Sequence, residues 1–152
     1  MKTSFSFQAI LIAGIVATAA MTAFTYMAPL MGFEMNIPGM LAGTMGTPVI
    51  VGWIAHFMIG IILAIIFAGI FLPVTKQEAD FKSGAVYGIF PWIIAQLIVM
   101  PMMMVMNGGT FTSGLFSGSI VMAMASLVGH LIYGAVLGKI YKPQTILVNA
   151  TS

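Results

Sequence analysis

Four long apolar runs, joined by short connections, constrain the fold of this chain more than any other feature. They cover approximately residues 6–30, 48–72, 83–106 and 115–138. Each run exceeds the roughly 20 residues that an α-helix needs to cross about 30 Å of hydrocarbon. Because lipid offers no hydrogen-bond partners to the backbone, such runs span a membrane as helices. The sequence therefore predicts an all-α membrane protein with four transmembrane helices in an up-down bundle, forming a single transmembrane domain over residues 1–152.

The composition is that of an integral membrane protein and gives no sign of catalysis. Hydrophobic residues make up 61% of the chain and charged residues only 5%, whereas soluble domains carry roughly 25% charged residues. The chain has no cysteine, which excludes disulfides, thiolate metal sites and cysteine nucleophiles. No acidic residue lies within a predicted span. We therefore expect no catalytic residues and a protein that is not an enzyme.

The N-terminus has the outline of a secretory signal, since Lys2 precedes the first apolar run and Ala17-Thr18-Ala19 offers small residues for cleavage. The run nevertheless continues to about Leu30. Because this length is enough to span a membrane, we expect a first transmembrane helix instead.

The positive charges predict the orientation in the membrane. With four spans, every lysine falls on the same side, namely Lys2, Lys76, Lys82, Lys139 and Lys142. The positive-inside rule then places both termini in the cytoplasm, in a multi-pass protein of the cell inner membrane. The connection over 31–47 lies on the outer side with Glu34, and it leaves room for a short interfacial or re-entrant piece. So small a basic excess indicates topology and not nucleic-acid binding.

An internal repeat is visible when the second half of the sequence is laid over the first. An offset of 74 residues aligns His56 with His130, Gly60 with Gly134 and Leu63 with Leu137. The pattern predicts a tandem duplication of a helical hairpin. Because each hairpin crosses the membrane out and back, the two copies would have the same orientation.

The only two histidines both lie in apolar runs, and every fourth residue around them is small. The stripes are Gly52, His56, Gly60 and Ala64 in the second run, and Ser126, His130, Gly134 and Gly138 in the fourth. In lipid, small residues allow helix backbones to pack closely. We therefore expect these residues to form helix-packing faces that turn the histidines toward neighbouring helices. Thr22 and Gln96 are the polar side chains that we expect to bond to them.

Two interpretations of the histidines stay open. The favoured one is that each imidazole is a hydrogen-bonded group that fixes the register between helices, so that no cofactor is needed. The alternative is haem b held by His56 and His130, since haem is bound between bundle helices by such ligands. With span centres near residues 60 and 126, the two histidines would differ by roughly 12 Å in depth, which disfavours one shared haem.

Methionine is abundant, with 15 residues, and many of them fall at the outer end of the predicted bundle. Thioethers bind Cu(I), so a copper site at Met100, Met102, Met103 and Met104 is a second alternative. The run MPMMMVM lacks regular ligand spacing. We therefore favour flexible apolar packing as the role of these side chains.

Three segments carry a resemblance to known proteins. These are MTAFTYMAPLMGFEMNIPGMLAG, GWIAHFMIGIILAIIF and GHLIYGAVLGKIY. Together they resemble a group of small, uncharacterised bacterial and archaeal four-helix membrane proteins, whose pattern is matched at Pro29–Gly32, Glu34–Pro38 and Gly129–Gly134. The resemblance implies a four-helix membrane fold. It implies no activity, because the group has none assigned.

The sequence favours a non-catalytic accessory or scaffold subunit of a larger membrane complex, such as a respiratory one. Its expected partners are membrane lipid and other membrane subunits or further copies of itself, with no nucleic acid. The first alternative is a membrane protein that binds haem b or Cu(I). The second is a small channel or transporter formed by an oligomer.

Overall fold

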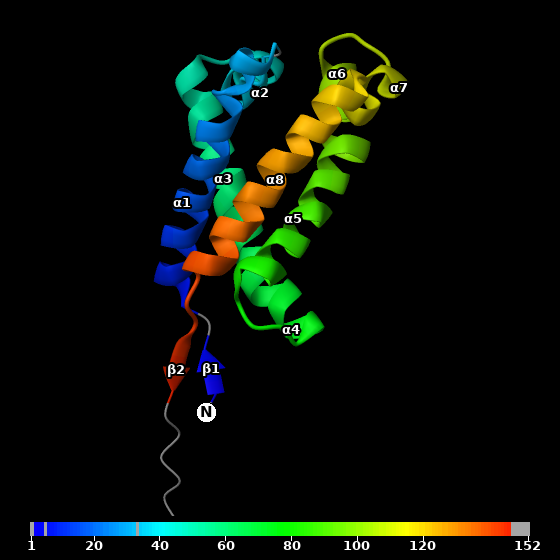
Figure 1. Cartoon of the computed structure of the whole chain (residues 1–152). Helices are drawn as coiled ribbons and strands as arrows, with labels where there is room; N and C mark the ends of the chain where they lie inside the picture. Colours follow the sequence, from blue (N-terminus) through cyan, green and yellow to red (C-terminus); the bar gives the residue numbers. More distant parts are fainter. Residues whose placement is uncertain (1, 5, 33, 147–152) are drawn as a thin grey trace, which may run out of the picture.

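The structure, a computed structural model, describes residues 2–4, 6–32 and 34–146 and forms a bundle of four long helical segments (Figure 1). The segments that are long and apolar enough to cross a membrane are Phe7–Leu30, Val49–Thr75, Phe81–Met106 and Ile120–Ile140. The predicted number of spans and their helical character are confirmed. The fourth segment begins later than the sequence suggested, because Leu115–Gly118 forms a separate turn.

The first two spans are built from several helical pieces. The first span contains α1 (Phe7–Thr25) and the short 3₁₀ helix η1 (Ala28–Met31). The second contains α3 (Val49–Ile66), the π-helix η2 (Phe67–Phe71) and α4 (Leu72–Thr75). Between these spans lies α2 (Ile37–Met45), a short helix that folds back against α3.

The last two spans differ in regularity. The third contains α5 (Phe81–Ile94), the π-helix η3 (Ala95–Val99) and α6 (Met100–Met106), whereas the fourth is the single helix α8 (Ile120–Ile140). They are joined by α7 (Phe111–Gly114) and the 3₁₀ turn η4 (Leu115–Gly118).

Both π-helices have the same cause in the sequence. Each ends two residues before a proline, η2 before Pro73 and η3 before Pro101. A proline has no N–H to donate, and its ring clashes with the carbonyl group four residues earlier. The preceding turn therefore widens and the helix continues without breaking.

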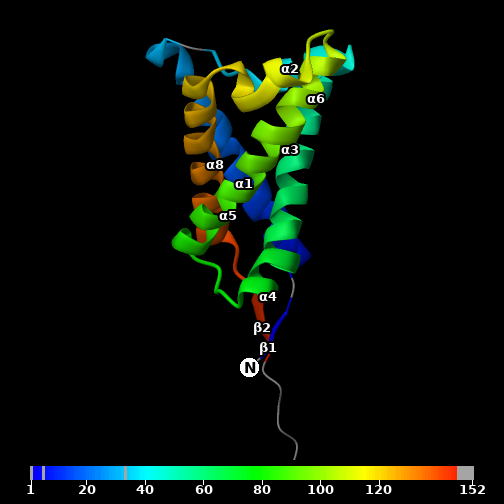
Figure 2. The same cartoon turned by 90° about the vertical axis from the view of Figure 1, so that its right-hand side faces the viewer.

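The helices pack in the order α3, α1, α8, α5. The most extensive contact is between α5 and α8, which lie side by side in the part of the bundle nearest the chain termini (Figure 2). Glycines permit this approach. A Cβ atom at Gly134 would collide with the carbonyl oxygen of Gly84, and one at Gly88 would collide with that of His130. The two backbones are thus in direct contact, as expected for small-residue faces in lipid.

The core lies in the half of the bundle nearest the chain termini, called the terminal half below. Its buried cluster includes Phe67, Tyr87, Tyr133 and Leu137. Two hydroxyl groups bridge the helices: Tyr87 donates to the carbonyl oxygen of Leu63 at 2.7 Å, and Tyr133 donates to that of Gly60 at 2.5 Å. In an apolar interior such paired hydroxyls avoid the cost of an unsatisfied polar group.

A short ribbon outside the spans joins the two ends of the chain. The strand β1 (Lys2–Ser4) pairs antiparallel with β2 (Gln144–Ile146). The ribbon extends beyond the terminal half (Figure 1). This ribbon could not be predicted from the sequence, because three-residue strands carry almost no periodic signal.

Candidate functional site

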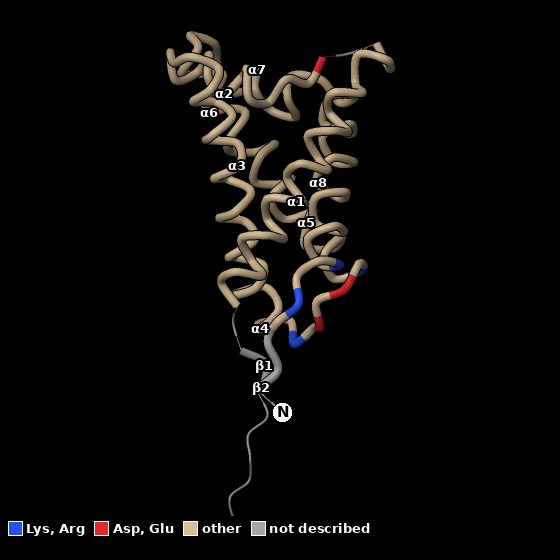
Figure 3. Tube along the Cα trace, turned by 90° about the vertical axis from the view of Figure 1, so that its left-hand side faces the viewer, with Lys and Arg blue, Asp and Glu red and all other residues tan. Residues whose placement is uncertain are grey.

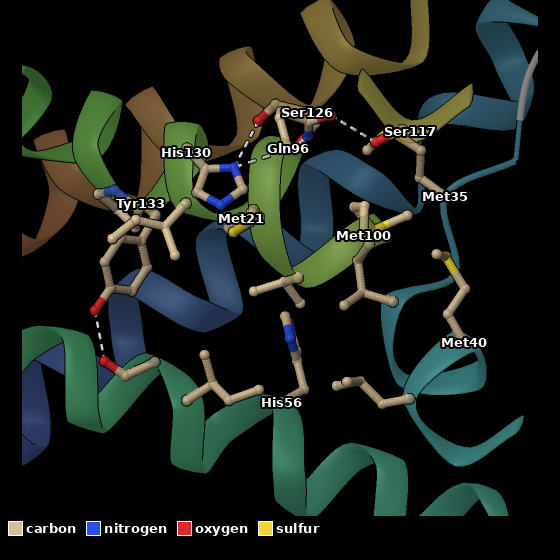
Figure 4. A pocket seen from close by; sticks show the side chains of 18 of the residues that line it. Met21, Met35, Met40, His56, Gln96, Met100, Ser117, Ser126, His130 and Tyr133 are labelled. Carbon is tan, nitrogen blue, oxygen red and sulfur yellow. Dashed lines mark hydrogen bonds between the residues drawn. The ribbon is translucent and has the colours of Figure 1, made fainter. Parts of the chain in front are cut away.

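The half of the bundle away from the termini, called the distal half, contains a cavity of about 370 Å³. Here the pair α1 and α3 diverges from the pair α5 and α8 (Figure 1). Side chains from all four spans, from α2 and from η4 form the wall. The wall is mostly apolar and includes the methionines Met21, Met35, Met40, Met100, Met103 and Met122. A few polar residues interrupt it, most of them labelled in Figure 4: Thr18, His56, Gln96, Ser117, Ser126, His130 and Tyr133.

His130 lies on α8 and has one ring nitrogen committed to its own helix. Its Nδ1 is 2.8 Å from the carbonyl oxygen of Ser126 and 3.4 Å from the Oγ of the same residue. A carbonyl oxygen has no proton to give, so Nδ1 carries the proton and donates it. The other nitrogen, Nε2, faces away from Ser126 toward the cavity (Figure 4). In the neutral ring this atom is a hydrogen-bond acceptor.

His56 lies on α3 and is fixed by a threonine of α1. Its Nε2 is 2.9 Å from the Oγ1 of Thr22. The hydroxyl group of Thr22 donates its own proton to the carbonyl oxygen of Thr18 at 2.7 Å. Nε2 of His56 must therefore supply the proton of the bond to Thr22. At 7% exposure the imidazole is buried between the helices.

Gln96 joins three elements of the wall from within η3. Its Nε2 donates to the Oγ of Ser126 on α8 at 3.2 Å, and its Oε1 accepts from the Oγ of Ser117 in η4 at 2.8 Å. The side chain is only 1% exposed. Because a π-helix shifts the direction of its side chains relative to an α-helix, η3 sets where Gln96 points.

The two polar residues expected beside the histidines therefore have different roles. Thr22 is bonded directly to His56, whereas Gln96 contacts Ser126 and Ser117 and not an imidazole. The depth difference expected from the sequence does not separate the histidines, since both line the same cavity. The expectation took residue 126 as the centre of the fourth span, but α8 runs from Ile120 to Ile140 and has His130 at its midpoint.

The small residues of the two stripes lie against other helices. Gly60 and Ala64 of α3 face Thr18 and Gly14 of α1. In the same way, Gly134 and Gly138 of α8 face Gly84 of α5, and Ser126 accepts from Gln96. Gly52 differs, because it packs against Pro38 and Ala42 of α2 and not against a spanning helix.

The four methionines considered for Cu(I) are not brought to one point. Met100 and Met103 line the cavity. Met102 is 52% exposed on the outside, and Met104 packs against Gly109 and Gly114. Consecutive residues of a helix point in different directions, so the run MPMMMVM distributes its sulfur atoms around α6. Within the described residues, no group of three or more His, Asp or Glu side chains could hold a metal ion.

Haem would make a stricter demand on the same residues. Ligation by two histidines needs a free nitrogen of each ring directed at one iron. His130 offers Nε2 to the cavity, whereas Nε2 of the more deeply buried His56 is occupied by Thr22 and only its Nδ1 keeps a lone pair. The geometry favours His130 as a contact for an occupant and His56 as a group that ties α3 to α1. Haem b at this pair stays a prediction.

Sequence reasoning missed several residues of the wall. Tyr133 follows His130 by three positions and shares its helix face, so the period of the helix could have indicated it. Met35 and Met40 come from the connection before and within α2. No local pattern shows where such a connection folds. Ser117 is held with a positive φ of 56°, which is uncommon for a residue with a side chain.

Comparison with known proteins finds a family and leaves the activity open. The model of one protein family, described as a family of unknown function, matches residues 6–146. No curated protein and no solved structure matches the chain.

Proposed function

Since the chain belongs to this family of unknown function (DUF6789), membership supplies no activity, and we propose from the cavity that the protein binds a lipophilic small molecule within the membrane. The observation that carries the proposal is the apolar cavity between the spans, with a few polar groups converging on it. Sites for small molecules are typically concave, with volumes of about 300–1,000 Å³ and a mainly apolar lining. The cavity, at about 370 Å³, lies within that range.

The surroundings of the cavity support entry from the bilayer. Within the most apolar 18 residues of each span, only 22% and 17% of the residues are buried in the second and third spans, against 39% in the first and fourth. Their cavity-lining residues Ile59 and Ile94 are 45% and 51% exposed. An apolar molecule dissolved in lipid could therefore pass between these two spans without crossing a polar barrier.

Native mass spectrometry of the full chain, extracted from its membrane in a mild detergent, tests the proposal. Ala95 lines the cavity, so Ala95→Phe should fill it and remove a bound mass that the wild type retains. Ala19→Phe places the same side chain on the exposed face of α1 and should leave the bound mass in place. A bound mass that survives Ala95→Phe, or none in the wild type, would contradict the proposal. An absorption spectrum with and without dithionite on the same sample separates haem b from other occupants.

A second proposal is that the chain serves as a non-catalytic accessory subunit of a larger membrane complex. The weakly buried surfaces of the second and third spans favour it, because another membrane subunit could cover them. Gentle extraction followed by a native gel tests this proposal. Migration of the chain alone as a monomer would contradict it.

The inner-membrane location, with both termini in the cytoplasm, is also part of the proposal. It is supported by the lysines, which Figure 3 colours blue at the end of the bundle that carries the termini. Lys76 caps the C-terminal end of α4, Lys82 lies in the first turn of α5, Lys139 lies in the last turn of α8 and Lys142 follows it. Glu34 lies in the connection between η1 and α2, at the opposite end. Because the chain has no cysteine, single-cysteine variants report topology without background. In intact cells an impermeant maleimide should label Gly43→Cys and not Gln77→Cys; the reverse pattern would invert the topology.

The tandem repeat has support from equivalent contacts in the two hairpins. Gly14 of α1 lies against Gly60 of α3, and its repeat-related partner Gly88 of α5 lies against Gly134 of α8. The repeat also relates Thr22, which bonds to His56, to Gln96 in the second hairpin. Alignment of the first and second halves across the family tests it, since a true repeat gives matched positions above chance.

A further inference from the structure

We propose that the molecule in the cavity carries an O–H group, as a lipophilic phenol or alcohol does, and donates it to Nε2 of His130. The inference rests on the proposed binding function and names the chemical class of the ligand. The reason is that most donor protons of the cavity wall are already bonded to acceptors within the protein.

His130 is the anchor because its two nitrogens have different roles. The Nδ1–H group donates to the carbonyl oxygen of Ser126 at 2.8 Å. This bond leaves Nε2 with a lone pair and no proton, on the side of the ring that faces the cavity (Figure 4). The imidazole is partly exposed, unlike the buried ring of His56. An occupant therefore meets an acceptor at this point of the wall.

The hydroxyl groups around the cavity offer few protons to an occupant. Those of Thr18 and Tyr133 donate to the carbonyl oxygens of Gly14 and Gly60, at 2.7 and 2.5 Å. The hydroxyl group of Ser117 donates to Oε1 of Gln96 at 2.8 Å. These donors are used within the protein, because each already has an oxygen acceptor there and a hydroxyl group that gave it up would lose that hydrogen bond.

The two other polar residues of the wall are Gln96 and Ser126. Gln96 is 1% exposed and is bonded at both ends of its amide. Ser126 accepts from Gln96, and its own proton is uncommitted among the described contacts, but the residue is only 8% exposed. The six methionine sulfur atoms are weak acceptors. The accessible wall therefore presents acceptors to an occupant and few donors.

This asymmetry selects between ligands of nearly equal shape. A ligand with an O–H group pairs with His130, whereas an ether or ketone at the same point brings a second lone pair against Nε2. A hydrogen bond in such a site contributes about 0.5–1.5 kcal/mol net. That range corresponds to a preference of about 2- to 12-fold for the hydroxyl compound.

The experiment compares two probes that differ only in whether the aryl oxygen carries a proton or a methyl group. Binding of 4-octylphenol and of its methyl ether, 4-octylanisole, is measured by native mass spectrometry on the full chain in mild detergent. In the wild type we expect the phenol to bind about 2- to 12-fold more tightly than the ether. In His130→Phe, which keeps an aromatic ring without the acceptor, we expect the preference for the phenol over the ether to vanish.

The outcomes separate this inference from the function on which it rests. If both probes bind the wild type equally and Ala95→Phe abolishes both, the cavity binds lipophilic molecules and the hydroxyl inference is wrong. If neither probe binds, or if Ala95→Phe leaves their binding unchanged, the proposed function itself is wrong. The wild-type comparison needs no variant at His130, so it decides the question even if His130→Phe does not fold.

Discussion

In the terminal half of the bundle the helices meet backbone to backbone, whereas in the distal half the same helices diverge around a cavity. Gly84 and Gly134 bring α5 and α8 into direct contact in the terminal half, and the hydroxyl groups of Tyr87 and Tyr133 bind carbonyl oxygens of α3. In the distal half the facing residues are larger, as Met100 and Met122 are. The size of the residues along a helix therefore determines where the helices of a membrane bundle come into backbone contact.

The irregular helices contribute to the opening. The π-helix η3 (Ala95–Val99) lies in the third span at the level of the cavity, and Ala95, Gln96 and Val99 belong to the wall. The other π-helix, η2, lies in the terminal half, where Phe67 belongs to the core. The same local distortion therefore serves packing in one half and lines a cavity in the other.

The largest expected effect comes from placing one bulky side chain in each half. Ala17 is 0% exposed within the terminal core, so Ala17→Phe should destabilise the protein by about 3 kcal/mol or more through overpacking. Ala95→Phe enters the cavity and should change the stability little. Thermal unfolding in detergent measures both, with Ala19→Phe on the exposed face of α1 as the control. An equal loss for Ala17→Phe and Ala95→Phe would mean that the distal half is as closely packed as the terminal half.

A second test distinguishes the effect of close contact between the α5 and α8 backbones from the effect of helix propensity. Gly134→Ala forces a methyl group against the backbone of Gly84, and we expect a loss of about 2 kcal/mol. Gly43→Ala in α2 has no neighbour within 4 Å of the added atom and should be neutral or slightly stabilising. Thermal unfolding of the two variants, measured side by side, checks the difference. Equal stabilities would show that α5 and α8 are not held in backbone contact.

Much of the terminal half could be predicted from the sequence. The number of spans followed from run length, and the small residues at every fourth position marked real contacts, since Gly60 lies against Thr18 and Gly134 against Gly84. These features depend on residue size and on the period of the helix, both of which are local. A neighbouring helix can then pack against a face of small residues in only a few ways.

The distal half could not be predicted as fully, because its cavity depends on where connections fold. Met35 and Met40 reach the wall through the segment around α2, and Ser117 through a turn in which Phe116 and Ser117 both have positive φ. Neither arrangement has a periodic signal. The sequence also placed the centre of the fourth span near residue 126, whereas α8 begins at Ile120 and has its midpoint at His130.

A smaller effect is expected from the hydroxyl groups that tie the terminal half together. Tyr133→Phe removes the bond between α8 and the carbonyl oxygen of Gly60, an oxygen that keeps its hydrogen bond within α3, at a side chain that is only 2% exposed. We expect a loss of about 1 kcal/mol, typical of one hydrogen bond between membrane helices. Tyr26→Phe, at a side chain 53% exposed beside Trp53, is the matched control and should change the stability little. Equal unfolding temperatures of Tyr133→Phe and the control would show that the bridge between α8 and α3 contributes nothing to closure of the terminal half.

The smallest expected effect is a dependence of the terminal half on pH through Asp80. This exposed residue caps α5 just outside the span, and its Oδ1 accepts from the backbone N–H of Ser83 at 2.7 Å. That bond, together with the side chain of Ser83, holds the pKa of Asp80 below its usual range. The stabilisation is therefore present above the unfolded pKa of about 3.9 and is lost as the pH falls through the lower, folded value.

Asp80→Asn isolates this effect, because asparagine caps a helix about as well as aspartate and does not titrate. We expect the unfolding temperature of the wild type to fall more than that of Asp80→Asn when the pH is lowered from neutrality to below about 4. Probe binding in the distal half should not follow this difference, since Asp80 lies at the opposite end of α5 from Pro91 and Ile94, which line the cavity. If binding and stability change together, the two halves are coupled through α5, and the cavity depends on how firmly the terminal half is closed.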